Sequence, residues 1–234
     1  MQGDALLAVL QLSDSGFPNG RYTLSHGLEA LAHEGLLSAQ CSPHVLAAFL
    51  GDYVRFGVAP SDGIALACAH RTVDLEGEVD VERVVQIDRR LAAVKLAREG
   101  REASARTGRA LLAAAPVVAG VRMSGLVDLV EVGHTPGNHA VVVGLLSALL
   151  GIPTFHAVAG ELSAFSTGWL AAAVRLGLTD HLSAQLVLRR VRPALVAAAE
   201  LAVLADLDDI AACSPLADLM SMRHESSGLR MFST

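Results

Sequence analysis

The stretch "HAVVVGLLSALLG", residues 139–151, decides the fold of this chain. Its apolar residues cover nearly the whole circumference of a helix and leave no face for water. A helix of this kind belongs at the centre of a helical bundle. The apolar run that it starts, Ala140 to Ile152, is too short to span a bilayer, so we expect a buried core helix and no contact with a membrane.

Helical patterns also dominate the first half of the chain. Ser42 followed by Pro43 is typical of a helix start, and the apolar stripe after this pair is expected to end near Gly57. A second helix is expected to bury one apolar face over 84–94. The sequence therefore predicts two helices here, each with one side in the core.

A further helix is expected over "REASARTGRALLAAA" (101–115), with an end at Pro116. Gly108, in its middle, is expected to let a neighbouring helix approach closely. Near the other end of the chain, Gly177 should stop a long helix and Thr179 should cap the next one. Pro193 should kink that last helix, because proline removes a backbone donor and clashes with the preceding turn.

Strand signals are nearly absent, since we find no alternating runs joined by Asn-Gly or Asp-Gly turns. The fold class expected is all-α: a single-domain bundle of about eight to ten helices over residues 1–234. Apolar residues make up 52% of the chain and charged residues 18%, which indicates a globular protein. The net charge of −6, without a basic stripe, argues against a nucleic-acid partner.

The three cysteines, Cys41, Cys68 and Cys213, are odd in number and far apart. They suggest neither a disulfide framework nor a cysteine zinc site, and they fit a reducing cytoplasm. The N-terminus lacks the basic region of a signal peptide. We therefore expect a cytoplasmic protein.

The short motifs of common catalytic sites are missing. Glu131 and His134 have the Glu-x-x-His spacing of helical di-iron sites, but one such match with a glycine inside is more simply a coincidence. His134 and His139, five apart across Pro and Gly, are a weak metal candidate. Asp14, Ser25 and His26 do not make a hydrolytic triad, because adjacent helical residues point about 100° apart.

Two polar, arginine-bearing segments remain, residues 13–30 and 214–234. The first contains a Pro-Asn-Gly turn, after which Thr23 or Ser25 can cap a helix. The second is either a frayed chain end or a partner surface, since Met and Phe beside Arg suit an interface. The residues themselves leave these two alternatives open.

These two ends also carry a resemblance to a known family. "LQLSDSGFPNGRYTLSHGLEA" (10–30) resembles the start of UreF urease accessory proteins, where L-x-x-x-D-x-x-x-P-x-G-x-[FY]-x-x-S-x-G-L-E is typical. "MRHESSGLRMFST" (222–234) is similar to the family's ending. The Ala/Leu-rich segments between them fall in the family's order, so the resemblance covers nearly the whole chain.

The resemblance implies an all-α protein that is not itself a catalyst and has no intrinsic cofactor. Members bind the accessory protein UreD, also called UreH, and the GTPase UreG. Their complex delivers nickel to the urease apoprotein; nickel is handled by the complex and GTP is bound by UreG. Members usually form homodimers, and the partner-binding parts are expected near residues 1–30 and 214–234.

The resemblance also implies site residues. Tyr22 and Arg230 stand at positions implicated in recruiting UreG, and Arg175 stands at a basic position that is another candidate for this contact. Arg230 would suit a carboxylate of the partner. Three further residues match the M-R-H-E segment that is ordered when UreD binds: Arg223, His224 and Glu225.

The chain departs from the family pattern at Arg21, at His26-Gly27 and at Ser227-Gly228, the last of which lacks the usual tyrosine. Three other functions stay open. One is a regulator of GTP hydrolysis that supplies an arginine to the GTPase. Another is a metal carrier whose ligands we cannot name. The last is an all-helical enzyme without a short motif, built from residues such as Cys68, His156, Glu161 and Trp169.

Overall fold

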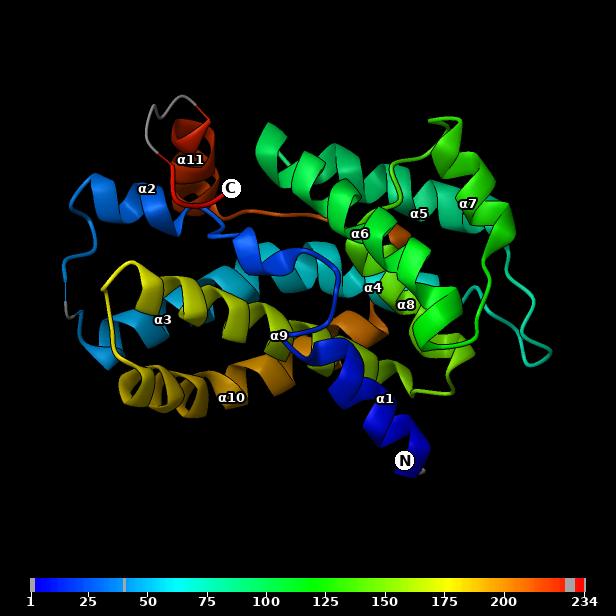
Figure 1. Cartoon of the computed structure of the whole chain (residues 1–234), viewed down its shortest axis with the longest axis horizontal. Helices are drawn as coiled ribbons and strands as arrows, with labels where there is room; N and C mark the ends of the chain where they lie inside the picture. Colours follow the sequence, from blue (N-terminus) through cyan, green and yellow to red (C-terminus); the bar gives the residue numbers. More distant parts are fainter. Residues whose placement is uncertain (1–2, 40, 226–229, 234) are drawn as a thin grey trace.

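A computed structural model describes residues 3–39, 41–225 and 230–233 of the chain. In this part of the chain the molecule is all-α, as predicted, and the nearest approach to a sheet is an isolated bridge between Val73 and Val79. Figure 1 shows one bundle of packed helices. The α-helices are α1 (Gly3–Ser13), α2 (Leu28–His33), α3 (Pro43–Tyr53), α4 (Ile64–His70), α5 (Val81–Val94), α6 (Arg98–Val118), α7 (Ser124–Glu131), α8 (His139–Leu149), α9 (Thr154–Arg175), α10 (His181–Leu204) and α11 (Pro215–His224).

Helix α8 lies at the centre of the bundle, as its sequence predicts. Every residue from His139 to Ser147 is buried, and α4, α6 and α9 pack around it. Two glycines make this possible. A Cβ atom at Gly144 would lie 2.4 Å from the Leu66 carbonyl oxygen of α4, and one at Gly108 of α6 would lie 1.9 Å from the Gly137 carbonyl oxygen. The close approach expected at Gly108 is therefore confirmed.

The helix that begins at Pro43 does not end near Gly57, so that prediction is wrong. Ser42 caps it as expected, since its Oγ accepts a hydrogen bond from the Val45 N–H. The chain then continues through a π-helical segment, η2 (Val54–Gly63), into α4 without a break. Gly57 serves packing instead, because a Cβ atom there would lie 3.2 Å from the Ser214 Cβ atom.

The π-helical segment passes Pro60, which lacks the N–H that a helix would use to bond an earlier carbonyl. The extended segment between α10 and α11 bonds to this part of the helix from outside: Cys213 N–H donates to the Phe56 carbonyl oxygen at 2.9 Å. Ala211 N–H donates to the Pro60 carbonyl oxygen at 3.0 Å. This segment crosses the molecule in Figure 1 and fixes where α11 begins.

Of the predictions for the next two helices, the buried face of α5 is confirmed and the end of α6 is not. Helix α5 buries the face expected, with Val84, Ile87 and Leu91 inaccessible to solvent. Helix α6 passes Pro116 and ends at Val118, so the predicted end at Pro116 is wrong. The last turn closes beyond the proline, since Ala119 N–H donates to the Ala115 carbonyl oxygen at 3.0 Å.

Helix α9 ends before Gly177, whose φ of 70° requires the left-handed region, as predicted. The cap of α10 is Asp180, whose Oδ1 accepts from Ser183 N–H at 2.9 Å, rather than Thr179. The Oγ1 of Thr179 is buried and makes no described hydrogen bond. Helix α10 runs continuously through Pro193 to Leu204.

Helices α9 and α10 form a long antiparallel pair along one side of the bundle, with α3 beside them (Figure 1). By length and composition α9 could cross a membrane, but 56% of its most apolar stretch is buried inside the fold. It packs against α1, α8 and α10. These contacts are those of a core helix.

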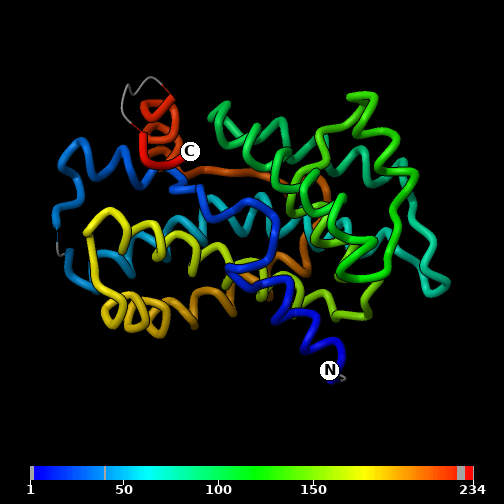
Figure 2. The backbone as a smooth tube through the Cα atoms, viewed as in Figure 1, coloured from blue at the N-terminus to red at the C-terminus, as the bar shows by residue number. Residues whose placement is uncertain are grey.

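The two chain ends are placed differently. The backbone trace in Figure 2 shows α1 pointing away from the bundle, whereas the C-terminal end returns to lie beside α2 and α11. The segment between α1 and α2 crosses the molecule between these places. This arrangement brings the two polar segments of the sequence together at one end of α9.

Candidate functional site

The segment that joins α1 to α2 turns sharply at three positions. Gly20, His26 and Gly27 have positive φ angles of 76°, 52° and 80°. Between them a single 3₁₀ turn, η1 (Arg21–Thr23), holds Tyr22 with 63% of its surface exposed. The expected capping of α2 by a Thr or Ser side chain is wrong, because the residue before the helix is Gly27, which has none to offer.

Arg175, the last residue of α9, lies between two aromatic rings. Its Cζ atom is 4.1 Å from the ring centroid of Tyr22 and 4.3 Å from that of Phe232. Its Nη2 also donates to the Tyr22 carbonyl oxygen at 2.7 Å. Each contact is a favourable cation–π geometry. We call Tyr22, Arg175 and Phe232 the terminal patch, since two of its members come from opposite ends of the chain.

Beneath this patch lies a buried charge cluster of Glu29, Glu99, His224 and Arg230. The Nε2 of His224 is 3.0 Å from Glu29 Oε2, and its Nδ1 is 2.8 Å from Glu99 Oε2. Arg230 Nη1 donates to Glu99 Oε1 at 2.6 Å. The side chains of Glu29, Glu99 and His224 are 3%, 8% and 1% exposed. The two carboxylates and the imidazole are thus almost inaccessible to solvent, whereas Arg230, 36% exposed, closes the cluster on its outer side.

Glu29 also receives two backbone donors from the chain end. Met231 N–H donates to its Oε1 at 2.7 Å, and Phe232 N–H donates to its Oε2 at 3.0 Å. Burial by itself would raise the pKa of Glu29, but these hydrogen bonds and the one from His224 favour the charged form and hold the pKa below its ordinary value. The carboxylate is therefore the form that binds the chain end.

The neighbours of the cluster complete the attachment. Glu225 Oε1 accepts from Glu99 N–H at 3.2 Å, and the Glu225 carbonyl oxygen accepts from Arg230. Ser233 N–H donates to the Thr23 carbonyl oxygen at 2.9 Å. The described end of the chain is therefore fastened to α2, α6 and the segment before α2.

The remaining predicted residue, Arg223, faces outward. Its Nη1 lies 2.9 Å from Glu34 Oε2, and both side chains are about half exposed. An ion pair in such a position contributes little to stability. The departure at Ser227-Gly228 lies outside the described residues.

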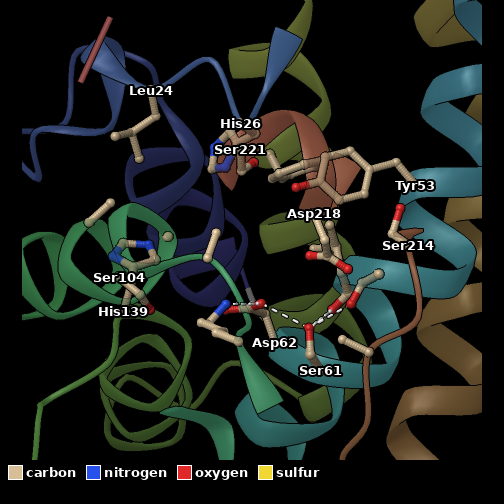
Figure 3. Close-up of a pocket in the computed structure, with 18 of the residues that line it drawn as sticks. Leu24, His26, Tyr53, Ser61, Asp62, Ser104, His139, Ser214, Asp218 and Ser221 are labelled. Atoms are coloured by element: carbon tan, nitrogen blue, oxygen red, sulfur yellow. Dashed lines mark hydrogen bonds and ion pairs between the residues drawn. The ribbon is translucent and has the colours of Figure 1, made fainter. Parts of the chain in front are cut away.

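A cavity of about 130 Å³ lies next to the cluster, between η2, α6, α9 and the segment before α11. In Figure 3 the labelled side chains of His26, Asp62 and Asp218 border it, with His139 on the side opposite Tyr53. Burial, with the positive charges of Arg21 and Lys95, lowers the pKa of His26 to about 3, so this ring is neutral at pH 7. It packs against Phe165 at 4.8 Å between ring centroids.

One wall of this cavity is an ion pair. Arg21 Nη1 donates to Glu161 Oε2 at 2.8 Å and lies 3.2 Å from His139 Nε2. Burial would raise the pKa of Glu161, but the charges of Arg21 and His139 outweigh it and lower the pKa to about 2. Arg21, a departure from the family pattern, therefore ties the segment before α2 to α8 and α9.

The histidine and glutamate pairs considered for metal are not brought together. Gly133, with a φ of 73°, separates Glu131 at the end of α7 from His134, whose carbonyl oxygen accepts from Arg89. His139 lies instead beside Arg21. Within 3–39, 41–225 and 230–233, no group of three or more His, Cys, Asp or Glu side chains is placed to hold a metal ion.

The residues named for a motif-free enzyme are also dispersed. Glu161 lines the cavity of about 130 Å³ described above, whereas Cys68 lines a different pocket with Arg71 and Asp206. Trp169 is inaccessible to solvent and stacks on Phe49 at 5.9 Å between ring centroids. The polar groups that such a site needs in one pocket are therefore not provided by this set.

The structure thus unites most of the predicted positions in two adjacent places. Tyr22 and Arg175 lie in the terminal patch, and His224 and Arg230 lie in the charge cluster. The sequence reasoning missed Phe232, Glu29 and Glu99. Glu29 closes the quoted N-terminal pattern and could have been found there, but no pattern marks Glu99, which reaches the cluster only through the fold.

Comparison with known proteins gives a consistent result. The UreF family model matches residues 41–192, more than half of the chain. A urease accessory protein UreF of Trichodesmium erythraeum (strain IMS101) is 34% identical over 230 residues, covering 97% of this chain and 95% of that protein. The protein of that name from Paenarthrobacter aurescens (strain TC1) is 32% identical, with coverages of 97% and 96%. One from Bradyrhizobium sp. (strain ORS 278) is 31% identical, with coverages of 97% and 91%.

Proposed function

Because the chain belongs to the UreF family of urease accessory proteins, we propose that it is an adaptor that recruits the GTPase UreG in the cytoplasm. In this proposal it binds UreD/UreH, and the complex supports GTP-dependent delivery of nickel to the urease apoprotein. The chain itself holds no cofactor, acts as a homodimer and performs no chemistry.

One observation carries the proposal: the terminal patch. It joins the exposed Tyr22 of the N-terminal segment, Arg175 at the end of α9 and the buried ring of Phe232 near the C-terminal end. Tyr22 is 63% exposed, and an exposed aromatic ring on a fixed arginine is a common anchor at protein interfaces. The stacking leaves Arg175 with a defined direction, so little side-chain entropy is lost on binding.

The geometry favours an adaptor over a direct regulator of GTP hydrolysis. Arg175 is stacked between two rings and donates to a backbone carbonyl, and Arg230 donates to Glu99 of its own chain. An arginine that enters a GTPase site must leave such contacts. We therefore assign to Arg175 the support of the patch and to Arg230 the placement of the C-terminal end.

Co-purification tests the proposal. Tagged chain would be expressed with UreD/UreH and UreG, and the recovered UreG would be measured for Tyr22→Ala and Arg175→Ala. We expect both variants to keep UreD/UreH and to lose most of the UreG. Arg89→Ala is the matched control, since Arg89 likewise donates to a backbone carbonyl, that of His134. Full recovery of UreG with both patch variants would reject the assignment.

The same complexes allow GTP turnover by UreG to be measured with and without the chain and UreD/UreH. We expect the patch variants to change turnover in proportion to the UreG that they bind. A changed turnover at unchanged binding would assign the patch to regulation instead. Light scattering of the purified chain, which reports its mass in solution, tests the homodimer.

A further inference from the structure

The four carboxylate oxygens of Glu29 and Glu99 all face the C-terminal part of the chain. On Glu29, Oε1 accepts from Met231 N–H and Oε2 accepts from Phe232 N–H. On Glu99, Oε1 accepts from Arg230, and Oε2 lies 2.8 Å from His224 Nδ1. Every carboxylate oxygen of these two glutamates, which lie on different helices, thus has a partner among His224, Arg230, Met231 and Phe232.

Both glutamates are nearly inaccessible to solvent, with side-chain exposures of 3% and 8%. Two buried carboxylates flanking one imidazole ring are unfavourable unless cations compensate them. Both ring nitrogens of His224 lie close to these carboxylates, at 2.8 and 3.0 Å. Arg230 adds a positive charge at Glu99 Oε1, so the C-terminal part of the chain supplies the partners that the two buried carboxylates need.

The same contacts determine where Phe232 lies. Its N–H is fixed by Glu29 at 3.0 Å, and its ring is 4% exposed and 4.3 Å from the Arg175 Cζ atom. Arg175 in turn stacks on Tyr22 and donates to its carbonyl oxygen. A path of direct contacts therefore runs from the two glutamates to the exposed ring of Tyr22.

We propose that Glu29 and Glu99 form a two-carboxylate receptor for the chain's own C-terminal end, and that they are positioning residues for the terminal patch. By holding Arg230, Met231 and Phe232, they set the ring of Phe232 against Arg175 and so fix the surface that Tyr22 presents. The effect on UreG binding rests on the proposed function. The attachment of Met231 and Phe232 to the two glutamates can be measured without any partner.

The test replaces each carboxylate with the amide of the same shape. In Glu29→Gln and Glu99→Gln the negative charge is lost, and one acceptor oxygen becomes an N–H₂ group that cannot accept. Glu34→Gln is the matched control, because Glu34 is the residue directly after α2 and pairs with Arg223 at the surface. Thermal unfolding of each full-length variant shows whether the rest of the fold is intact.

The readout is hydrogen exchange of the C-terminal peptide that contains Met231 and Phe232. We expect exchange to become about tenfold faster or more in both test variants, since a hydrogen bond to a charged group is worth at least a tenfold change in an equilibrium. Glu34→Gln should leave the exchange unchanged. Unchanged exchange in Glu29→Gln and Glu99→Gln would overturn the proposal.

Partner binding separates this inference from the proposed function. Faster exchange together with weaker recovery of UreG supports both. Faster exchange with full recovery of UreG keeps the receptor but removes the patch from recruitment. If the Gln variants unfold, Arg230→Lys, which retains the charge without the forked guanidinium, is measured in the same way: we expect partial loss of protection, and full protection would contradict the role of Glu99.

Discussion

The surroundings of α8 and the charge cluster are both buried, but they are held together by opposite means. Around α8 the decisive feature is the lack of atoms: Gly108 and Gly144 allow backbones to touch where a Cβ would overlap a carbonyl oxygen. In the cluster the decisive feature is charge, on Glu29, Glu99 and His224. Steric fit does not depend on pH, whereas paired charges do, so the two regions should fail under different conditions.

The largest effect is expected at Gly108. A Cβ atom there would lie 1.9 Å from the Gly137 carbonyl oxygen, a backbone atom that cannot rotate away. Gly108→Ala should lower the free energy of unfolding by about 3 kcal/mol or more, as overpacking of a tight contact does. Urea unfolding followed by circular dichroism measures this. Gly168→Ala is the control: it is helical with no atom within 4 Å, so a gain of about 0.5 kcal/mol is expected from helix propensity.

A similar but smaller loss is expected in the cluster. His224→Ala removes the ring between two buried carboxylates and should cost about 3 kcal/mol, the lower end of the range for an unpaired buried charge. The adjacent Arg223→Ala breaks the half-exposed pair with Glu34, and loss of a surface ion pair should cost less than about 1 kcal/mol. Equal losses for these neighbours, measured by urea unfolding, would show that charge in the cluster does not hold this region.

A third effect is expected in acid, at the ion pair of Arg21 and Glu161, which is held by charge as the cluster is. The pKa of Glu161 is lowered to about 2 by the charges of Arg21 and His139, which outweigh burial. A carboxyl group with a lowered folded-state pKa contributes stability that is complete above its unfolded pKa, near 4.5, and is lost as pH falls toward about 2. The pKa of Glu29 is shifted in the same direction.

We therefore expect wild type to lose on the order of 2 kcal/mol more than Arg21→Met between pH ~5 and pH ~2, because the variant lacks the main charge that lowers the pKa. Urea unfolding at several pH values measures the difference. Parallel pH profiles for the two proteins would contradict the assigned ion pair.

The smallest effect on stability is expected at Tyr22. Its ring is 63% exposed, so Tyr22→Ala should change the free energy of unfolding by less than about 1 kcal/mol, the value of an exposed cation–π contact. Thermal unfolding checks this. A large loss would place Tyr22 among the residues that stabilise the fold. The role of Tyr22 in UreG recovery would then be tested with the milder variant Tyr22→Phe.

The parts of the fold that were predicted correctly are those where a local sequence feature allows one structural outcome, such as the apolar run of α8. An all-apolar run can only be buried, so α8 was placed correctly, and Gly108 marked a close contact. The predicted end at Pro116 was wrong because α6 runs on to Val118, and the predicted end at Gly57 was wrong because the chain continues there as a π-helical segment. For Gly57 the reason lies in the segment of Ala211 to Ser214, which is distant in the sequence.

Several residues of the candidate site could be named from the sequence, but the contacts between them could not. Tyr22, Arg175 and Arg230 were named from a resemblance, and the structure places them within one connected region. No local pattern could show that Arg175 lies between rings from both chain ends, or that Glu99 on α6 is the acceptor for Arg230. Such contacts depend on how helices pack, which a single sequence does not show.

The hydrogen bonds from Cys213 and Ala211 to the π-helical segment also bear on protein synthesis. The carbonyl groups of Phe56 and Pro60 leave the ribosome long before their donors are translated. Until then these two carbonyl oxygens lack the hydrogen bonds that Ala211 and Cys213 donate. A nascent or truncated chain that ends before Ala211 lacks both donors, so the contact between the π-helical segment and the segment before α11 can form only after Cys213 has been translated.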